Sequence, residues 1–267
     1  LFEIWFDGGA LPPEQGGPDI AALLAKYQKN AVCFQGPLGH PSLVRWVGNE
    51  DGRADYPCWS TTKILKDDTG PENPGAQYGA GDPEGEVWAP AEADMPNRHP
   101  RSNGGGWFWK AGEDDQVFSL EYLMESYHKS VGRNCNLLVG MVIDDRGLVP
   151  DADVKRFAEF GEALKEKFKD PVAQAGGRGN EIIFYFNEPK SFNCAVIMED
   201  ISQGERIRQY MIEAKVDGEF KTICQGSCIG HKRIESFESL QTQEVRLKIT
   251  ESEGVAAIRS FKLFNCE

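Results

Sequence analysis

The sequence of 267 residues lacks the long apolar stretch that a membrane-spanning helix requires, because it contains no run of 18 apolar residues. It also lacks an excess of positive charge, since 29 Lys and Arg residues are set against 42 Asp and Glu residues, a formal net charge of -13. Proteins that bind nucleic acids concentrate Lys and Arg on one face. Neither a membrane nor a nucleic acid is therefore expected as a partner.

Cysteine and histidine are scarce as well. Seven cysteines are too few and too scattered for a disulfide scaffold, and their odd number leaves at least one free thiol in a monomer. The four histidines show no metal-ligand spacing, and Cys224, Cys228 and His231 offer three ligands without a fourth. A metal site is therefore not expected. The sequence also has no Asn-x-Ser/Thr acceptor, so a secreted form would carry no ordinary N-glycan.

What the first 170 residues do contain is an alternation of short apolar strands and amphipathic helices. This pattern is typical of a βα barrel or another parallel α/β sheet. Strands are expected at 1–6, 31–35, 43–48, 86–90 and 136–143, and helices at 18–30, 120–131 and 151–168. Residues 53–85 are rich in Gly, Pro and Asp, which predicts a long loop of the kind that often serves function.

The remainder of the chain predicts a different architecture. Six short strands separated by polar turns, with no helix between them, are the signature of a β-sandwich. They are expected at 181–186, 193–201, 208–216, 220–228, 244–250 and 257–264. The prediction is an α/β chain with two domains: a partial (β/α) barrel catalytic domain at 1–170 and an all-β sandwich domain at 171–267.

The barrel prediction carries a problem of length. A (β/α)8 barrel takes about 250 residues, whereas only some 170 residues precede the predicted sandwich, and they contain five barrel-type strands. We therefore expect this chain to be the C-terminal part of a barrel protein, truncated at its N-terminal side.

Two carboxylates follow predicted strands. Asp7 ends the first strand and precedes two glycines, and Glu50 follows the third strand. Barrel enzymes keep their catalytic groups at the carboxyl ends of strands, and glycoside hydrolysis needs a pair of carboxyl groups on either side of the scissile bond. Trp46 and Trp59 lie near Glu50 and are candidates to pack against a sugar ring. The alternatives are an exposed Asp that begins a turn and tryptophans that belong to the core.

The residues around these acids resemble a known family. Asp7 lies in WFDG and Glu50 in RWVGNEDG, and the similarity continues through WAPAEAD at 88–94, GGWFW at 105–109, SLEYLMESYHKSVGRNCNLLVGMVIDDRGLV at 119–149 and IGHKRI at 229–234. Together these motifs resemble the α-L-fucosidases of glycoside hydrolase family 29. The resemblance covers nearly the whole chain and is greatest to the branch that acts on α-1,3- and α-1,4-linked fucose.

The resemblance implies a retaining double displacement on a fucosylated oligosaccharide or glycoconjugate. It assigns the nucleophile to Asp7 and the acid/base to Glu50, with no metal or cofactor. It also implies a secreted or lysosomal location.

Further site residues follow from the same motifs. Glu92, Asp94 and Arg98 match a segment in which polar groups hold sugar hydroxyls or one another, so a sugar contact and a structural ion pair are both open. Trp107 is the candidate wall for the methyl group of fucose. The insert at 100–106, PRSNGGG, departs from the tighter segment expected before it.

Three functions are therefore weighed. The first is a retaining α-L-fucosidase, of which this chain alone is expected to show little activity. The second is a catalytically impaired fragment that acts only as a carbohydrate-binding protein. The third is another retaining glycosidase with the same pair of carboxylates.

Overall fold

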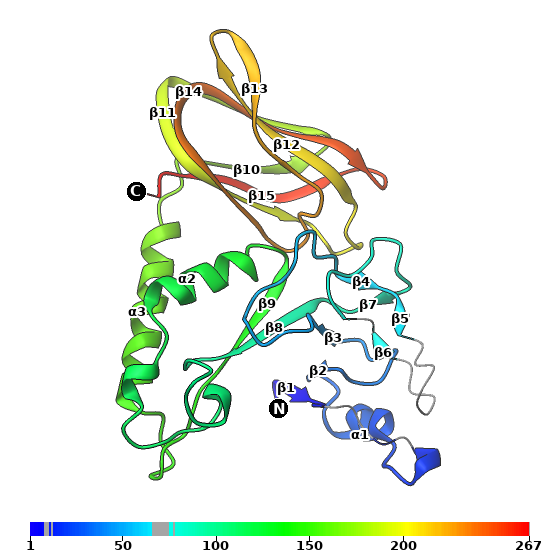
Figure 1. Cartoon of the computed structure of the whole chain (residues 1–267). Coiled ribbons are helices and arrows are strands. Elements are labelled where there is room, and N and C mark those ends of the chain that lie inside the picture. The colour runs from blue at the N-terminus through cyan, green and yellow to red at the C-terminus, as the bar shows by residue number, and fades with distance from the viewer. Residues whose placement is uncertain (8–10, 12, 66–74, 77, 267) are drawn as a thin grey trace.

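The computed structural model describes residues 1–7, 11, 13–65, 75–76 and 78–266. It contains a curled parallel sheet with helices at its side and, above both in the view of Figure 1, a larger antiparallel sheet. This confirms the predicted fold class, a partial (β/α) barrel followed by an all-β part. No helix in the described ranges is long and apolar enough to cross a membrane.

The parallel sheet has five strands in the order β1-β2-β3-β8-β9. Their bounds are Glu3–Trp5 for β1, Val32–Phe34 for β2, Leu43–Trp46 for β3, Ala91–Pro96 for β8 and Cys135–Gly140 for β9. Every neighbouring pair is parallel. All five carboxyl ends therefore meet at one edge of the sheet, where βα proteins place their functional groups.

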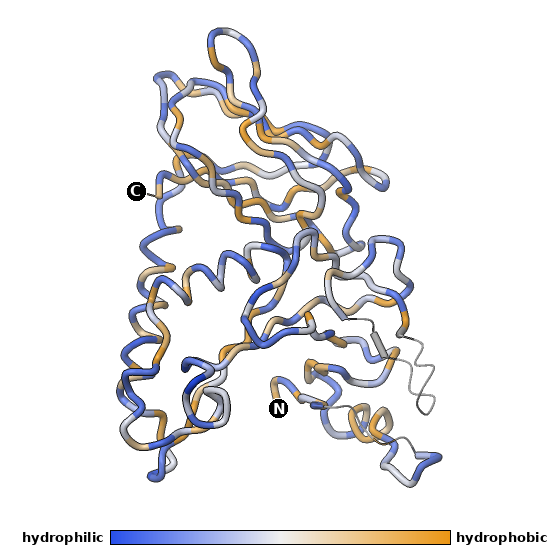
Figure 2. Tube along the Cα trace, viewed as in Figure 1, coloured by the Kyte–Doolittle hydropathy of each residue, from blue (hydrophilic) through white to orange (hydrophobic). Residues whose placement is uncertain are grey.

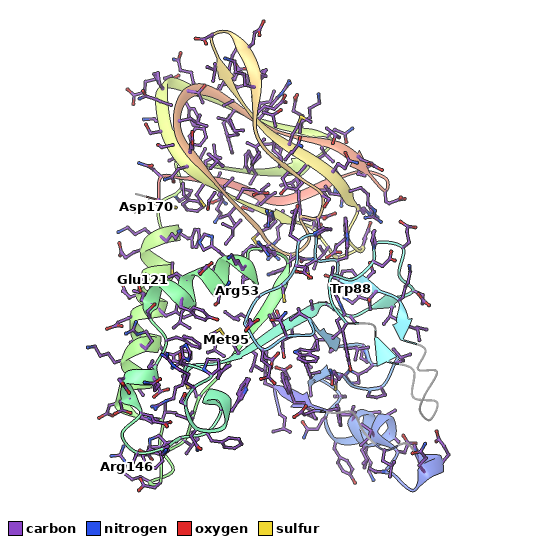
Figure 3. All side chains as sticks on the ribbon, viewed as in Figure 1. Arg53, Trp88, Met95, Glu121, Arg146 and Asp170 are labelled. Carbon is purple, nitrogen blue, oxygen red and sulfur yellow. The ribbon has the colours of Figure 1, made fainter. Side chains whose placement is uncertain are left out.

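In the described part of the chain, three α-helices accompany this sheet: α1 Ile20–Tyr27, α2 Leu120–Lys129 and α3 Asp151–Phe168. Side-chain oxygens of Asp19 and Ser119 accept backbone N–H bonds at the starts of α1 and α2, as N-cap residues do. Short 3-10 helices occupy Pro13–Gln15, Asn103–Gly106 and Asp114–Gln116. Met95 of β8 packs with Leu123 of α2 and Phe160 of α3, so these helices cover the outer face of the sheet (Figure 3).

The strand predicted at 86–90 is wrong, because the sheet strand in this region is β8. Within 86–90 only β7, Val87–Trp88, is extended, and it pairs with β4, Thr61–Thr62, outside the parallel sheet. The segment AEAD of β8 has no β-branched or aromatic residue, so local propensity does not reveal a strand that burial on both faces imposes.

The described residues of the loop predicted at 53–85 contain little regular structure. Besides β4 it holds β5, Ile64–Leu65, and β6, Gly75–Ala76, which pair with each other. Residues 66–74 and 77 of this loop, like Gly8 and Gly9 after Asp7, lie outside the described residues.

The antiparallel sheet has six strands in the order β10-β15-β11-β14-β12-β13. Their bounds are Ala173–Arg178, Glu181–Glu199, Ile207–Val216, Glu219–Gly226, Arg233–Ser252 and Ala257–Phe264 for β10 to β15 in turn. The two longest strands, β11 and β14, bend over a buried apolar core that includes Phe192, Tyr210 and Phe261. Figure 2 shows apolar residues alternating with polar ones along these strands.

Two of the predicted sandwich strands are in fact one. The strands expected at 181–186 and 193–201 are both parts of β11, whose pairing with β14 shifts register between Tyr185 and Lys190. The polar segment Asn187–Pro189 interrupts the apolar alternation there, so the sequence suggests a break in what is a bend. Strand β10 and the first half of β14 were not expected.

Side chains from the loop after β3 join the two sheets. The Tyr56 hydroxyl accepts the Ser227 N–H and donates to the Cys228 carbonyl, at 2.9 and 3.2 Å. The Asn134 side chain contacts the Cys58 carbonyl, the Glu205 carboxyl and the His231 N–H. Because these partners come from both parts of the chain, the loop is fixed to the antiparallel sheet.

Candidate active site

Asp7 and Glu50 both lie at the carboxyl edge of the parallel sheet. Asp7 follows β1 by two residues and Glu50 follows β3 by four, and both side chains are exposed. The turn that carries Glu50 is held against β8, because the Gly52 N–H donates to the Asp94 carbonyl at 3.0 Å. Glycine is favoured at that point, because its φ is 65° and a Cβ there would lie 2.4 Å from the Met95 sulfur and displace that side chain.

The floor between these acids is formed by alternate residues of β8. Ala93 and Met95 face the outer core clusters, so Glu92 and Asp94 face inward. The indole of Trp46 donates to Asp94 Oδ1 at 2.6 Å, and the indole of Trp5 donates to Glu92 Oε1 at 2.9 Å. Glu92 and Asp94, both predicted as site residues, are therefore buried, and each accepts a hydrogen bond from a tryptophan.

The charges of both candidate catalytic residues affect the pKa of Asp94. Burial raises the pKa of the Asp94 carboxyl to about 6, against the effect of the Trp46 hydrogen bond. The negative charges of Glu50 and Asp7 raise this pKa further. Coulomb interactions act over short range at a solvated edge. The strands thus bring Asp7, Glu50 and Asp94 together although 43 and 44 residues separate them along the chain.

A second pair of acids lies deeper in the sheet. Burial, and then the charge of Glu3, raise the pKa of Glu92 to about 8. Burial also raises the pKa of Glu3, and the two side chains are hydrogen-bonded to each other. Two carboxyl groups in contact share a proton more easily than they hold two negative charges. Glu3 and Glu92 are therefore expected to hold one proton between them at neutral pH.

This raised pKa predicts how stability depends on pH. Since the pKa of Glu92 is about 8 in the folded state and 4.5 in the reference state, the folded chain binds more protons between these pH values. Its stability therefore falls as pH rises through that window. Replacement of Glu92 by Gln should stabilise the chain by several kcal/mol at pH 8 and have little effect near pH 4. Urea unfolding at both pH values measures the difference.

The exposed Glu86 supplies the control for that experiment, because Glu86→Gln removes a carboxylate of the same type from the surface. Its unfolding free energy should follow the wild type at both pH values. A Glu92→Gln variant that is less stable than the wild type at pH 8 would contradict the protonated pair.

Trp107 approaches the same edge from the loop between β8 and α2. Its indole N–H donates to Glu50 Oε2 at 3.1 Å. The ring lies against Gly140 at the end of β9, where a Cβ would come within 2.3 Å of a ring carbon. The residue predicted as a wall of the sugar site therefore contacts the candidate acid/base directly.

Arg98 and Trp59 make contacts with other parts of the chain instead of with Asp7 or Glu50. The Arg98 side chain is fully buried and its guanidinium contacts Asp153 Oδ2 at 2.6 Å and Asp114 Oδ1 at 3.2 Å. Of the two alternatives for Arg98, a sugar contact and a structural ion pair, these contacts favour the ion pair. Trp59 is 6% exposed and stacks beneath Arg208 of the antiparallel sheet, with 5.2 Å from the guanidinium carbon to the ring centroid. Both contacts are structural.

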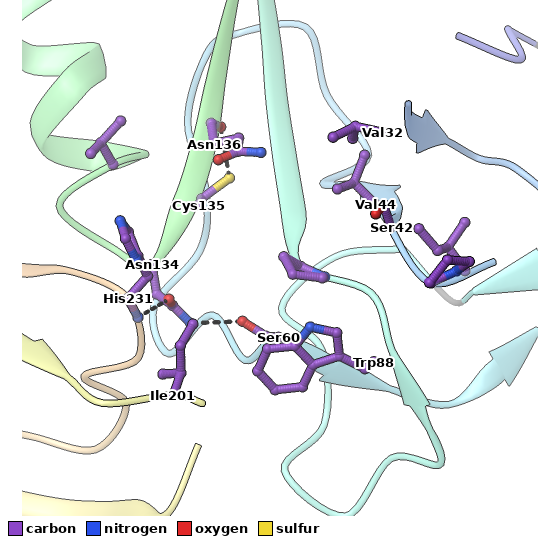
Figure 4. A pocket seen from close by; sticks show the side chains of 14 residues that line it. Val32, Ser42, Val44, Ser60, Trp88, Asn134, Cys135, Asn136, Ile201 and His231 are labelled. Carbon is purple, nitrogen blue, oxygen red and sulfur yellow. Dashed lines mark hydrogen bonds between the residues drawn. The ribbon is translucent and has the colours of Figure 1, made fainter. Parts of the chain in front are cut away.

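A cavity of about 280 Å³ lies at the opposite end of the parallel sheet (Figure 4). It is lined by the starts of β2, β3 and β9 and by residues of the antiparallel part, among them Ile201 and His231. Asp7 and Glu50 do not line it. Since catalytic groups of barrel enzymes gather at carboxyl ends, this cavity is not the candidate site.

Sequence reasoning missed three residues of the site: Glu3, Trp5 and Gly140. Alternation along β1 would have placed Glu3 and Trp5 on the same face as Asp7, which is the signal that could have found them. Gly140 gives no such signal, because its importance comes from a ring that approaches from a distant loop. Among the described residues, no cluster of three or more His, Cys, Asp or Glu side chains is arranged to hold a metal.

Barrel enzymes place their active sites at the carboxyl ends of the strands, and glycoside hydrolases use a pair of carboxyl groups, so the two exposed acids at this edge fit a barrel glycoside hydrolase. No protein-family model matches the chain. It is similar to two curated plant proteins: Putative alpha-L-fucosidase 1 of Oryza sativa subsp. japonica, 30% identical over 98% of this chain, and Alpha-L-fucosidase 1 of Arabidopsis thaliana, 29% identical over 88%. The chain spans 56% and 52% of these relatives, about half of their length.

Solved structures give the same assignment. The crystal structure of an alpha-L-fucosidase homologue from Bacteroides thetaiotaomicron VPI-5482 has 36% sequence identity and a TM-score of 0.88, and the match covers all of this chain and 61% of that one. Structures that share the fold at lower identity include members of glycoside hydrolase family 29. This similarity to α-L-fucosidases extends over nearly the whole chain, in agreement with its motifs.

Proposed function

We propose that this chain carries the catalytic carboxylates of a retaining α-L-fucosidase, with Asp7 as the nucleophile and Glu50 as the acid/base. The observation that supports this most is that both acids are exposed at the carboxyl edge and that the charges of both raise the pKa of the buried Asp94. A sugar at this edge can reach both carboxyl groups. Retaining glycosidases hold their two carboxyl groups about 5 Å apart.

In the first step an oxygen of Asp7 attacks the anomeric carbon of fucose and forms a covalent ester. The bond to the leaving oxygen breaks as Glu50 transfers its proton to that oxygen. In the second step Glu50, now ionised, takes a proton from water, and the water oxygen displaces Asp7. The anomeric configuration is inverted twice and so retained, and Glu50 ends protonated as it began.

The buried acids have a binding role in this proposal. Asp94 accepts the Trp46 N–H with one oxygen, which leaves the other able to accept a hydroxyl of the sugar. Glu92 precedes Asp94 by two residues on β8 and lies farther from the carboxyl edge. It accepts the Trp5 indole N–H, and this bond positions β1, the strand that leads to Asp7. Exposed ring surface of Trp46 and Trp107 can pack on the apolar side of fucose.

The proposed substrate is a fucosylated oligosaccharide or glycoconjugate with terminal α-linked fucose. The motif around Glu50 favours α-1,3 and α-1,4 linkages. The test compares hydrolysis of an aryl α-L-fucoside, a Lewis trisaccharide and an α-1,2-linked fucoside, with this chain and with the longest natural product of its gene. Release of fucose from the Lewis trisaccharide in preference to the α-1,2 linkage is the expected result.

Two outcomes would contradict the proposal. Binding of fucosylated glycans without cleavage by either form would favour the carbohydrate-binding alternative. Cleavage of another α-linked sugar in preference to fucose would favour a different retaining glycosidase. Proton NMR of the sugar at early times determines whether the first product is the α-anomer, as retention requires.

A further inference from the structure

We propose that Trp107 is a positioning residue for the acid/base, and that Gly140 makes this possible. The proposal rests on the proposed function, in which Glu50 protonates the leaving oxygen. An exposed carboxylate at the end of a loop has several rotamers, and only some of them point its proton at the scissile bond. The bond from Trp107 Nε1 to Glu50 Oε2, at 3.1 Å, restricts those rotamers.

The loop around Trp107 is built for this contact. Gly104, Gly105 and Gly106 have φ values of 56°, 70° and 95°, a left-handed run that favours glycine at each position. Gly106 also approaches the backbone of Arg98, since a Cβ would lie 2.3 Å from the Arg98 carbonyl oxygen. The insert that departs from the expected pattern is therefore the element that turns Trp107 toward Glu50.

Strand β9 supplies the other half of the arrangement. The Trp107 ring occupies the space beside Gly140, where an added Cβ would lie 2.3 and 2.6 Å from two carbons of the six-membered ring. Any larger residue at Gly140 must displace the ring, and the indole N–H with it. The geometry thus assigns Gly140 an indirect role in the orientation of Glu50.

The bond also restricts which oxygen carries the catalytic proton. Oε2 accepts the indole N–H, and an indole nitrogen can only donate. The proton that Glu50 gives to the leaving oxygen therefore belongs to Oε1, and Oε1 is the oxygen that takes the proton from water in the second step. Trp107 moves no proton itself.

The test uses the dependence of rate on the leaving group. A Lewis trisaccharide needs protonation of its leaving oxygen, whereas α-L-fucosyl fluoride or a 2,4-dinitrophenyl fucoside needs little. Trp107→Phe keeps the ring and removes the N–H, so kcat/KM should fall by about 30- to 100-fold on the trisaccharide and by less than about threefold on the activated substrates. Gly140→Ala should show the same selectivity. A structural or substrate-binding role would lower both rates equally.

Two controls separate this proposal from the one on which it rests. Glu50→Gln must itself show the selective loss, and if it does not, the acid/base assignment fails rather than the role of Trp107. Trp109→Phe alters a neighbouring indole that makes no hydrogen bond in the described part of the chain, and it should leave both rates near the wild type. Equal losses in Trp107→Phe, beside a selective loss in Glu50→Gln, would overturn the positioning role alone.

A second readout needs no activity. In a proton–nitrogen spectrum of the labelled chain, Trp107→Phe identifies the indole signal of Trp107. Glu50→Gln replaces the carboxyl acceptor with an amide, which changes the hydrogen bond that the indole makes, and should shift that signal more than those of the other five tryptophans. An unchanged Trp107 signal in Glu50→Gln would show that the contact is absent in solution.

Discussion

Replacement of Asp7 by Gly should lower kcat/KM for an aryl α-L-fucoside by at least about 10³-fold, because the covalent intermediate can no longer form. Added azide should restore turnover by entering the space left by the carboxylate. It would attack from the face that Asp7 occupied, so the product should be β-L-fucosyl azide, with inverted configuration. Chromatography and proton NMR of the product measure both the rate and the configuration.

The same experiment on Glu50 gives the opposite stereochemistry. In Glu50→Ala the nucleophile is intact, so azide would attack the fucosyl-enzyme and release the α-azide. Asp51→Asn, which changes an exposed acid beside Glu50, should leave the rate within about twofold, as surface changes away from the chemistry usually do. An α-azide from Asp7→Gly, or full activity without azide, would show that Asp7 is not the nucleophile.

Loss of Asp153 should destabilise the chain by about 3 to 5 kcal/mol, because Asp153→Ala leaves the buried Arg98 guanidinium without its nearest counter-charge. Both side chains are fully buried, and Asp153 contacts the Nε and Nη2 atoms of Arg98. Asn97 donates to the same carboxylate at 3.1 Å, so a second buried donor loses its partner as well. Urea unfolding followed by tryptophan fluorescence measures the change.

Asp114 offers the matched control, since it contacts the same guanidinium but is 66% exposed. Asp114→Ala should cost less than about 1 kcal/mol, as exposed ion pairs do. Substitution of both partners by apolar residues, Arg98→Met with Asp153→Leu, should recover much of the stability lost in Asp153→Ala. A cost for Asp153→Ala no greater than that for Asp114→Ala would mean that Arg98 finds another partner or reaches water.

The sequence predicts where strands end better than it predicts which of their residues face the site. The apolar run before Asp7 and the one before Glu50 are short and end in polar residues, so the two exposed acids were found by their position. Strand β8 was misplaced because its inward residues, Glu92 and Asp94, are acids that a strand tolerates only when tryptophans bond to them. Those bonds join residues 87 and 48 positions apart, and local patterns carry no information on them.

Trp107 shows a different limit. The sequence marks it as an aromatic residue near a site, and a sugar contact is the ordinary expectation for such a residue. Its bond to Glu50 depends on three consecutive left-handed glycines and on the missing side chain at Gly140. In the sequence each of these glycines indicates only a turn. Glycine permits a left-handed backbone, but the residue type alone does not specify which way the chain turns or which side chain packs against the glycine.

The fixed loop after β3 has a consequence for the design of hybrid enzymes. Glu50 and Tyr56 lie six residues apart on one continuous segment, and Tyr56 is bonded to the antiparallel sheet. The antiparallel sheet therefore holds in place the segment that carries the proposed proton donor. Replacing that sheet with one from a relative would change the contacts that hold this segment. Residues 54–60 and their partners at 226–231 should therefore be transferred as one unit.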